Sequence, residues 1–300
     1  MLNKGGNLIA GKQFTDLTKA SALKDTNIIA VHDGNGLKQS NMKDVTAYMS
    51  DKFSNPNLLI NPDFKINQKG QESYTSGGFE YTVDRWRVSS AKVSVSDNGL
   101  MIQSTGNSGS WVSQKFEKEL EGVFTLSVKV SNINGKAYLT NPTNRVTITS
   151  AGIYSVTLSN LSEFNMFIEA STLVTIEWAK LEQGSIATPF VAPNYMEELM
   201  KCRYFYYQAN VGAEIVGQIG KQVKFNIPYL WMRTNPTAKI STDGDANKLI
   251  LSDSTDEKVL GINAYRDIGN THIEITTDTN KAGVFPLSGV VEIELDAEIY

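Results

Sequence analysis

The chain has 300 residues, of which 41% are hydrophobic and 20% are charged, and its formal net charge is −4. A chain of this length can hold two or three domains with cores of their own, and the composition is that of a folded protein rather than a disordered one. The lack of a Lys and Arg surplus argues against a nucleic-acid binder, because phosphate binding requires positive charge.

Cys202 is the only cysteine, which excludes an intrachain disulfide framework and favours a buried thiol in a core. The N-terminal residues lack the apolar segment of a signal peptide. No apolar run approaches the length of about 18 residues that a membrane-spanning helix requires, and no polybasic run suggests an anionic membrane surface. We therefore expect neither a signal peptide nor membrane insertion.

Residues 1–54 are predicted to form a separate N-terminal unit. A short strand is expected over 28–32, and two hairpin dipeptides, Asp-Gly and Asn-Gly, follow it. A helix is predicted from about Asn41 to Phe53, with Ser40 or Asn41 as its cap. The helix carries an apolar stripe of Met42, Val45, Met49 and Phe53. Such a stripe has to pack, either within the chain or on a partner subunit.

Residues 55–193 are predicted to form an antiparallel β-sandwich. Apolar and polar residues alternate in short segments separated by turns, which is typical of strands with one buried face. The strand with the clearest alternation contains Phe124, Leu126, Val128 and Val130. In the closing strand, Trp178 is expected on the same buried face as Ile176. Trp86 is also assigned to the core.

A linking helix is predicted within 194–208, running from Tyr195 to about Tyr207 with Asn194 as its cap. Apolar and aromatic residues occur around most of its circumference, so that it must be covered on two sides. One side can be covered by the chain's own β domains, and the other by a symmetry-related copy. Residues 209–300 are expected to be β structure again, because apolar residues alternate there.

Six segments carry a resemblance to a known family: 57–68 (NLLINPDFKINQ), 81–87 (YTVDRWR), 178–190 (WAKLEQGSIATPF), 201–207 (KCRYFYY), 231–236 (WMRTNP) and 294–299 (ELDAEI). The first three resemble the jelly-roll, carbohydrate-binding-like domain of tail-fibre and receptor-binding proteins of tailed bacteriophages. The others resemble that family's C-terminal module. The resemblance spans about residues 55 to 300.

The resemblance implies a mainly β protein with a jelly-roll sandwich, a C-terminal β domain, a short N-terminal attachment unit and a linking helix. It implies a homotrimer in the virion, assembled in the host cytoplasm, with residues 1–54 bound to other tail, collar or baseplate proteins. The β domains would recognise the host surface, with a glycan as the expected receptor. Two alternatives are a collar, head or baseplate decoration protein that binds only virion proteins, and a polysaccharide depolymerase.

No catalytic residue is predicted, since no nucleophile, metalloprotease or phosphate-loop motif occurs and the two histidines, His32 and His272, stand alone. Four carboxylates share one face of the last strand: Glu292, Glu294, Asp296 and Glu298. Their spacing is compatible with a glycosidase pair, but a regular row without a burying partner indicates a solvated face. We therefore expect a protein without enzymatic activity.

No metal site or cofactor is predicted. The run Asp243, Asp245 and Asn247 begins like a calcium loop, but its sixth position is Lys248 rather than Gly, which favours a polar hairpin tip. Related jelly rolls often bind a structural calcium near the first strand, where Asp63 lies. The family pattern usually has Glu at the position of Lys65 in this chain.

Two tryptophans are candidate ligand-binding residues. Trp111 should point away from the core of its strand, because Val112 and Phe116 occupy the opposite face. An exposed tryptophan there can stack on a sugar ring or contact another domain. Trp231 lies between two prolines and has the same two interpretations.

The candidate trimer interface lies on the linking helix. Its expected axis-facing residues are Met196, Met200, Tyr204 and Tyr207. Their spacing of four, four and three places them along one side of a helix. A three-fold bundle of such helices would bury the face that the chain's own domains leave uncovered.

Overall fold

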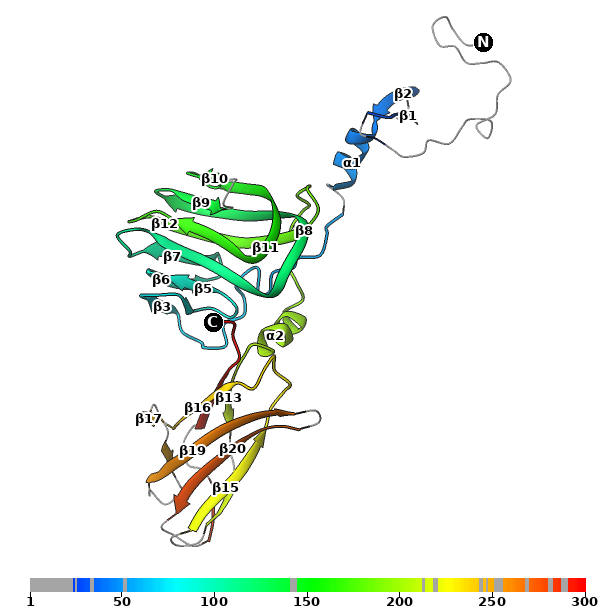
Figure 1. Ribbon diagram of the computed structural model, residues 1–300. Coiled ribbons are helices and arrows are strands. Elements are labelled where there is room, and N and C mark those ends of the chain that lie inside the picture. Colours follow the sequence, from blue (N-terminus) through cyan, green and yellow to red (C-terminus); the bar gives the residue numbers. More distant parts are fainter. Residues whose placement is uncertain are drawn as a thin grey trace, which may run out of the picture. The chain divides into compact units, whose positions relative to one another are not determined.

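The computed structural model describes residues 24, 26–32, 35–50, 53–140, 145–211, 214–217, 221–242, 245–246, 248–250, 256–267, 270–279, 283–286 and 291–300. The fold is mainly β and its strand pairs are antiparallel, which confirms the predicted fold class (Figure 1). The chain divides into two compact units, Met1–Ser54 and Asn55–Tyr300. None of the helices in the described part of the chain has the length and hydropathy needed to span a membrane.

The N-terminal unit contains a hairpin followed by a helix. Strands β1 (Ile28–His32) and β2 (Leu37–Asn41) pair antiparallel, and α1 (Met42–Ser50) begins directly after them. The side chain of Asn41 accepts a hydrogen bond from the backbone N–H of Asp44 at 2.8 Å, so Asn41 caps the helix, which decides between the two caps that the sequence left open, Ser40 and Asn41.

The apolar stripe of α1 is only partly covered within the N-terminal unit. Met42 and Val45 are half-buried. Met49 is 45% exposed, and Phe53 beyond the helix is 62% exposed. The C-terminal half of the stripe is therefore an accessible apolar surface.

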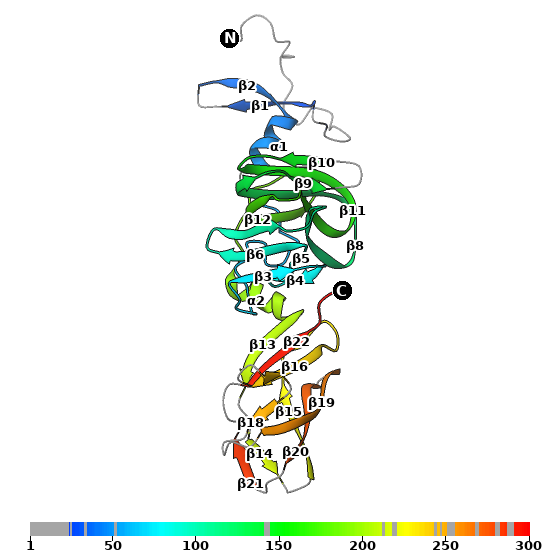
Figure 2. The same ribbon diagram turned by 90° about the vertical axis from the view of Figure 1, so that its left-hand side faces the viewer.

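The larger unit begins with one sheet whose strands curve around a common core (Figures 1 and 2). Its strands are β3 (Ser73–Ser76), β4 (Glu80–Tyr81), β5 (Arg87–Ser89), β6 (Ala91–Ser96), β7 (Gly99–Ser104), β8 (Ser110–Asn134), β9 (Ala137–Thr140), β10 (Arg145–Ile148), β11 (Gly152–Ile168) and β12 (Leu173–Gln183). The main order is β10-β9-β11-β8-β12-β7-β6-β3, while β5 pairs with both β4 and β8.

The two longest strands, β8 and β11, change direction where their register shifts between Ser159 and Glu163. At this point Gly122 and Asn160 both have positive φ angles, of 116° and 53°. The backbone N–H of Gly122 donates to the Asn160 side chain at 3.0 Å. The bulge lets each strand contribute to both sides of the core, which gives the sandwich-like arrangement.

Trp86 lies at the centre of this core, as predicted, and is fully buried. Its ring packs 4.9 Å from that of Phe64 and 5.2 Å from that of Phe164, measured between centroids. The indole N–H donates to the backbone oxygen of Asn61 at 2.8 Å, so the polar atom of this buried ring has a partner. Phe124, Leu126, Val128 and Val130 all belong to the core, as predicted. The prediction that only one face of this strand is buried is wrong, because Thr125 and Ser127 on the opposite face are buried as well.

Trp178 is not part of this core, contrary to the prediction. The register of β12 against β8 shifts between Ile176 and Trp178, so that Ile176 opposes Val130 and Trp178 opposes Lys129. This bulge moves the following side chains to the other face, and Ala179 takes the core position instead. Trp178 is half-buried and stacks on Phe190, with ring centroids 4.7 Å apart and ring planes 4° from parallel.

The linking helix α2 spans Tyr195–Arg203 and is shorter than predicted. Its cap is Asn194, as expected, whose side chain accepts hydrogen bonds from Met196 and Glu197. The prediction that the helix reaches Tyr207 is wrong. Tyr204 and Phe205 accept hydrogen bonds from the backbones of Arg233 and Ala297 instead. These long-range bonds take the chain out of the helix and into a strand.

The rest of the larger unit forms a second β domain. Its strands are β13 (Tyr206–Val211), β14 (Glu214–Gly217), β15 (Lys221–Pro228), β16 (Thr237–Thr242), β17 (Asp245–Ala246), β18 (Lys248–Ile250), β19 (Asp256–Asp267), β20 (Asn270–Thr279), β21 (Gly283–Pro286) and β22 (Val291–Asp296). They form sheets ordered β13-β22-β16-β17, β14-β21 and β15-β20-β19-β18. The C-terminal β domain thus begins at Tyr206, within the segment that the sequence assigned to the helix.

Candidate functional site

Trp111 lies on the outer face of β8, opposite the fully buried Val112. It is half-buried, and its ring centroid is 4.9 Å from that of Phe167, its register partner on β11. Phe167 stacks in turn on Tyr138 of β9, with centroids 6.2 Å apart. The guanidinium carbon of Arg145 lies 3.1 Å from the centroid of the Tyr138 ring. Trp111 is therefore the first ring of an outward-facing aromatic row within one sheet, a packing role that the sequence analysis did not consider.

Trp231 belongs to the other β domain, in the segment between β15 and β16, and is 44% exposed. Trp111 and Trp231 thus occupy different sheets, and a ligand contact at one would be separate from a contact at the other.

The four predicted trimer residues do not share one helix face. Met196 and Met200 project from α2 and are 60% and 48% exposed. Tyr204 caps the helix and is half-buried, with its ring edge-on to Phe205 at 5.2 Å. Tyr207 lies on β13, opposite Leu295, so its predicted helical position is wrong. The exposed apolar residues around α2, which we call the α2 surface, are Val191, Tyr195, Met196 and Met200.

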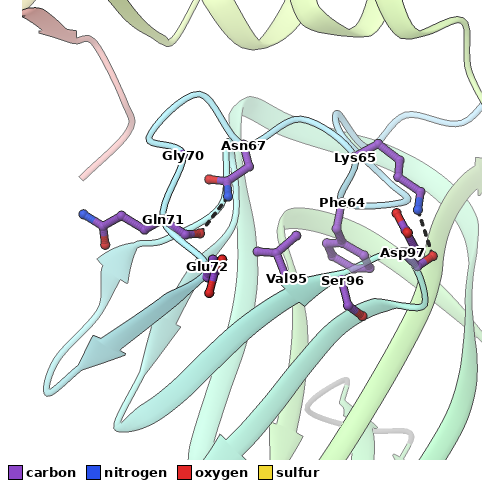
Figure 3. A pocket seen from close by; sticks show the side chains of 9 residues that line it. All are labelled: Phe64, Lys65, Asn67, Gly70, Gln71, Glu72, Val95, Ser96 and Asp97. Atoms are coloured by element: carbon purple, nitrogen blue, oxygen red, sulfur yellow. Dashed lines mark hydrogen bonds between the residues drawn. The ribbon is translucent and has the colours of Figure 1, made fainter.

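A polar cavity of about 500 Å³ lies at one end of the sandwich. It lies between the segment 64–72 and the turn that joins β6 to β7, and Figure 3 shows its lining side chains. Phe64 and Val95 give it an apolar wall, while the other side chains are polar. The side chain of Asn67 donates to the backbone oxygen of Gln71 at 2.9 Å, which fixes the loop (Figure 3).

A second cavity, of about 420 Å³, lies where the sandwich meets the C-terminal β domain. It is lined by Lys69, Gln71, Tyr206, Gln208, Glu292 and Glu294. Gln71 lines both cavities, and we call the two together the polar groove. Within it, the Tyr206 hydroxyl donates to the side chain of Gln208 at 2.9 Å.

Gln68 joins the sandwich to the C-terminal β domain next to the polar groove. Its side-chain amide donates to the carboxylate of Asp84 at 2.5 Å, in the sandwich, and to the backbone oxygen of Tyr206 at 2.7 Å, in β13. The Gln68 backbone N–H also donates to Asp84 at 2.7 Å. Because Asp84 is only 4% exposed, this bridge is anchored in the interior of the protein.

The second cavity is lined by more carboxylates than ammonium groups, which gives it an excess of negative charge. Burial raises the pKa of the Tyr206 hydroxyl, and nearby carboxylates, first among them Glu294, raise it further. The other carboxylates that contribute are Asp84, Asp296 and Glu292. An excess of negative charge favours neutral or positively charged ligands over anions.

The carboxylate row on the last strand is not uniformly solvated, contrary to the prediction. Glu298 is 5% exposed and forms a buried ion pair with Arg85 of the sandwich. Glu292 and Glu294 remain half-exposed and line the polar groove. The buried partner lies far away in the sequence, so the local pattern did not reveal it.

The region of Asp63 was searched for metal-binding side chains, together with the rest of the described part of the chain. No group of three or more His, Cys, Asp or Glu side chains there could hold a metal ion. The Lys65 ammonium donates to the backbone oxygen of Asp97 at 2.8 Å and so places a positive charge in this region. Asp243 and Asn247 lie outside the described residues.

Cys202 is fully buried in α2, as expected for a core thiol. Burial raises the pKa of this thiol, and the neighbouring carboxylates Asp84, Glu198 and Glu298 raise it further. A thiol in such a place stays protonated and is a poor nucleophile.

The groove residues carry no sequence signature, because Gln71, Gln208 and Glu72 occur in segments without a recognisable motif. The pairing of β13 with β22 places Gln208 opposite Glu294, which is far from it in the sequence. Neither a scan of protein-family models nor a search of curated protein sequences finds a match for this chain.

Proposed function

We propose that this protein is a structural, non-enzymatic component of a tailed-bacteriophage virion, namely a tail fibre or receptor-binding protein. The proposal rests on the six family-like segments and is supported by the antiparallel β fold in which they lie. The polar groove is the observation that carries the binding role. Its walls combine amides, carboxylates and a tyrosine around an open volume, which suits a hydroxyl-rich ligand such as a host-surface glycan.

The N-terminal unit would attach the protein to other virion proteins. Its helix presents Tyr48 and Met49, which are 64% and 45% exposed, and Phe53 beyond the helix is 62% exposed. Clustered apolar side chains of this kind are typical of surfaces that bind another protein.

Assembly as a homotrimer would use the α2 surface. Three copies could bury Met196 and Met200 against one another, while Tyr204 and Tyr207 contribute less because each is already half-buried within its own chain. The trimer number comes from the family resemblance, since the α2 surface by itself is compatible with other closed symmetries.

The test is adsorption of the labelled full-length protein to a panel of bacterial strains. A receptor-binding protein adsorbs saturably to some strains and not to others. A decoration protein that binds only virion proteins adsorbs to none, which would contradict the proposal. A depolymerase would in addition release reducing ends from the surface glycan of a strain that it binds, so that release is measured in the same samples.

A further inference from the structure

The polar groove carries more carboxylates than ammonium groups, and this imbalance restricts its ligand. We infer that, given the glycan recognition proposed above, the polar groove binds an uncharged oligosaccharide that spans both cavities and rejects glycans with carboxylate or phosphate groups. The inference rests on the lining residues, their hydrogen bonds and the shared position of Gln71.

The hydrogen-bonding groups of the groove match sugar hydroxyls. Amide side chains both donate and accept, as hydroxyl groups do, and Asn67, Gln71 and Gln208 supply them along the groove. Carboxylates only accept, so they favour ligands that bring O–H donors. Val95, which is half-buried, provides an apolar contact for the C–H face of a sugar ring, while Phe64 behind it is buried in the core.

The charges of the groove disfavour anions. Glu72 and Asp97 line the first cavity, and Glu292 and Glu294 line the second. The two lysines are engaged with the protein itself: Lys65 donates to the Asp97 backbone oxygen at 2.8 Å, and Lys69 donates to that of Tyr81 at 2.6 Å. The two ammonium groups keep their charge, but the four carboxylates outnumber them, so an anionic sugar would meet a lining with an excess of negative charge. Like charges are an effective means of rejecting a ligand.

The length of the ligand follows from Gln71. Gln71 lines both cavities, so a chain of sugars that fills one continues past Gln71 into the other. Its side-chain amide points away from Phe64 and Val95 (Figure 3), so removing it weakens binding of a ligand that passes Gln71, whereas a change confined to one cavity weakens only one half. A single sugar would occupy one cavity and bind more weakly than an oligosaccharide.

The test is an array of matched tetrasaccharides, each neutral member paired with a counterpart that carries uronate groups. The full-length protein should bind at least one neutral member at least about tenfold more tightly than its uronate counterpart at low ionic strength. Gln71→Ala should weaken binding of the neutral member at least about tenfold. Gln183→Ala, an exposed amide at the end of β12 outside the groove, is the matched control and should bind like the unmodified protein.

Neutralising the groove should relax its selectivity. The double variant Glu72→Gln and Asp97→Asn should bind the uronate counterpart at least about tenfold more tightly than the unmodified protein does, with a smaller gain at high salt. Glu292→Gln is a second neutralising variant, in the other cavity of the groove. Circular dichroism and the unfolding temperature show whether each variant is folded.

The outcomes separate the inference from the proposed function. Equal binding of neutral and uronate members, or neutral binding that Gln71→Ala leaves unchanged, overturns the inference, while adsorption to bacterial cells still supports receptor binding. Binding to no neutral member overturns the inference as well. The proposed function is overturned by a separate result, namely that the unmodified protein adsorbs to none of the bacterial strains.

Discussion

Arg85 and Glu298 form a buried ion pair that joins the sandwich to the end of the chain, and each side chain is 2% exposed. The Arg85 guanidinium also donates to the backbone oxygen of Lys115 at 2.7 Å and lies 3.7 Å from the centroid of the Phe205 ring. Next to the pair, the Tyr81 hydroxyl donates to the backbone oxygen of Ile299 at 2.7 Å. These contacts attach the C-terminal β domain to the sandwich beside the polar groove.

Removing one partner of this ion pair should destabilise the protein strongly. At pH 8 we expect Glu298→Ala to lower the free energy of unfolding by about 3–5 kcal/mol, because the Arg85 charge stays buried without its partner. Chemical denaturation measures the loss. The control is Glu177→Ala, which breaks the more exposed pair with Lys129 and should cost no more than about 1 kcal/mol. Equal losses in the two variants would contradict the importance of the buried pair.

The stability of the protein should depend on pH through the same carboxylate. Burial raises the pKa of Glu298 to about 7, although the Arg85 guanidinium lowers it in part. Between its unfolded pKa of 4.5 and this value, the folded protein binds more protons than the unfolded chain, so stability decreases as the pH rises. The contribution is at most about 3 kcal/mol over that window.

Denaturation curves at pH 5, 6, 7 and 8, values chosen to span this window, test the dependence. In Glu298→Gln the side chain does not titrate, and the slope between pH 5 and pH 7 should become shallower. Asp84 should retain part of the slope, since burial raises its pKa too. An unchanged slope in the Gln variant would show that Glu298 does not titrate in this range.

Trp111 does not line the polar groove and is a separate candidate receptor contact. Trp111→Ala removes both a candidate stacking surface and the contact with Phe167. We expect the variant to remain folded, with about 1 kcal/mol less stability, and to lose binding by about 1–3 kcal/mol. Trp111→Phe keeps an aromatic ring and should retain most of the adsorption. A folded Ala variant that adsorbs as well as the unmodified protein would exclude Trp111 as a receptor contact.

Assembly should depend on the α2 surface. Light scattering of the purified protein should give a mass three times the 33.0 kDa of one chain. The double variant Met196→Lys and Met200→Lys should shift the mass toward the monomer, because it places charges where apolar side chains meet. The control variant Glu197→Gln, which changes a residue of the same helix outside the α2 surface, should remain assembled. A monomeric unmodified protein at micromolar concentration would refute obligate assembly.

The sequence predicted the parts of the fold that depend on local patterns. The alternation around Leu126 and Val128 identified a core strand, Asn194 was recognised as a helix cap, and Asn41 was one of the two candidates for the other cap. The position of Trp86 in the core was also predicted correctly. In each case the side chains within a few residues determine the structure.

The errors occurred where distant residues decide the structure. Tyr206 and Tyr207 suit a helix or a strand equally by pattern, and only their pairing with β22 selects the strand. Trp178 was assigned to the wrong face because a bulge at Glu177 cannot be seen in an alternating pattern. Glu298 looked solvated because its partner Arg85 is 213 residues away.

The central claim, that the larger unit binds a surface glycan, is tested most directly by calorimetry. Protein-free surface glycan is extracted from a strain to which the full-length protein adsorbs and is titrated into the purified protein. The account predicts saturable binding that Gln71→Ala weakens at least about tenfold and that Gln183→Ala leaves unchanged. The claim would be contradicted if the titration gives no heat and the free glycan does not compete with the cells for the protein. This result counts only when the protein is folded and the strain adsorbs it.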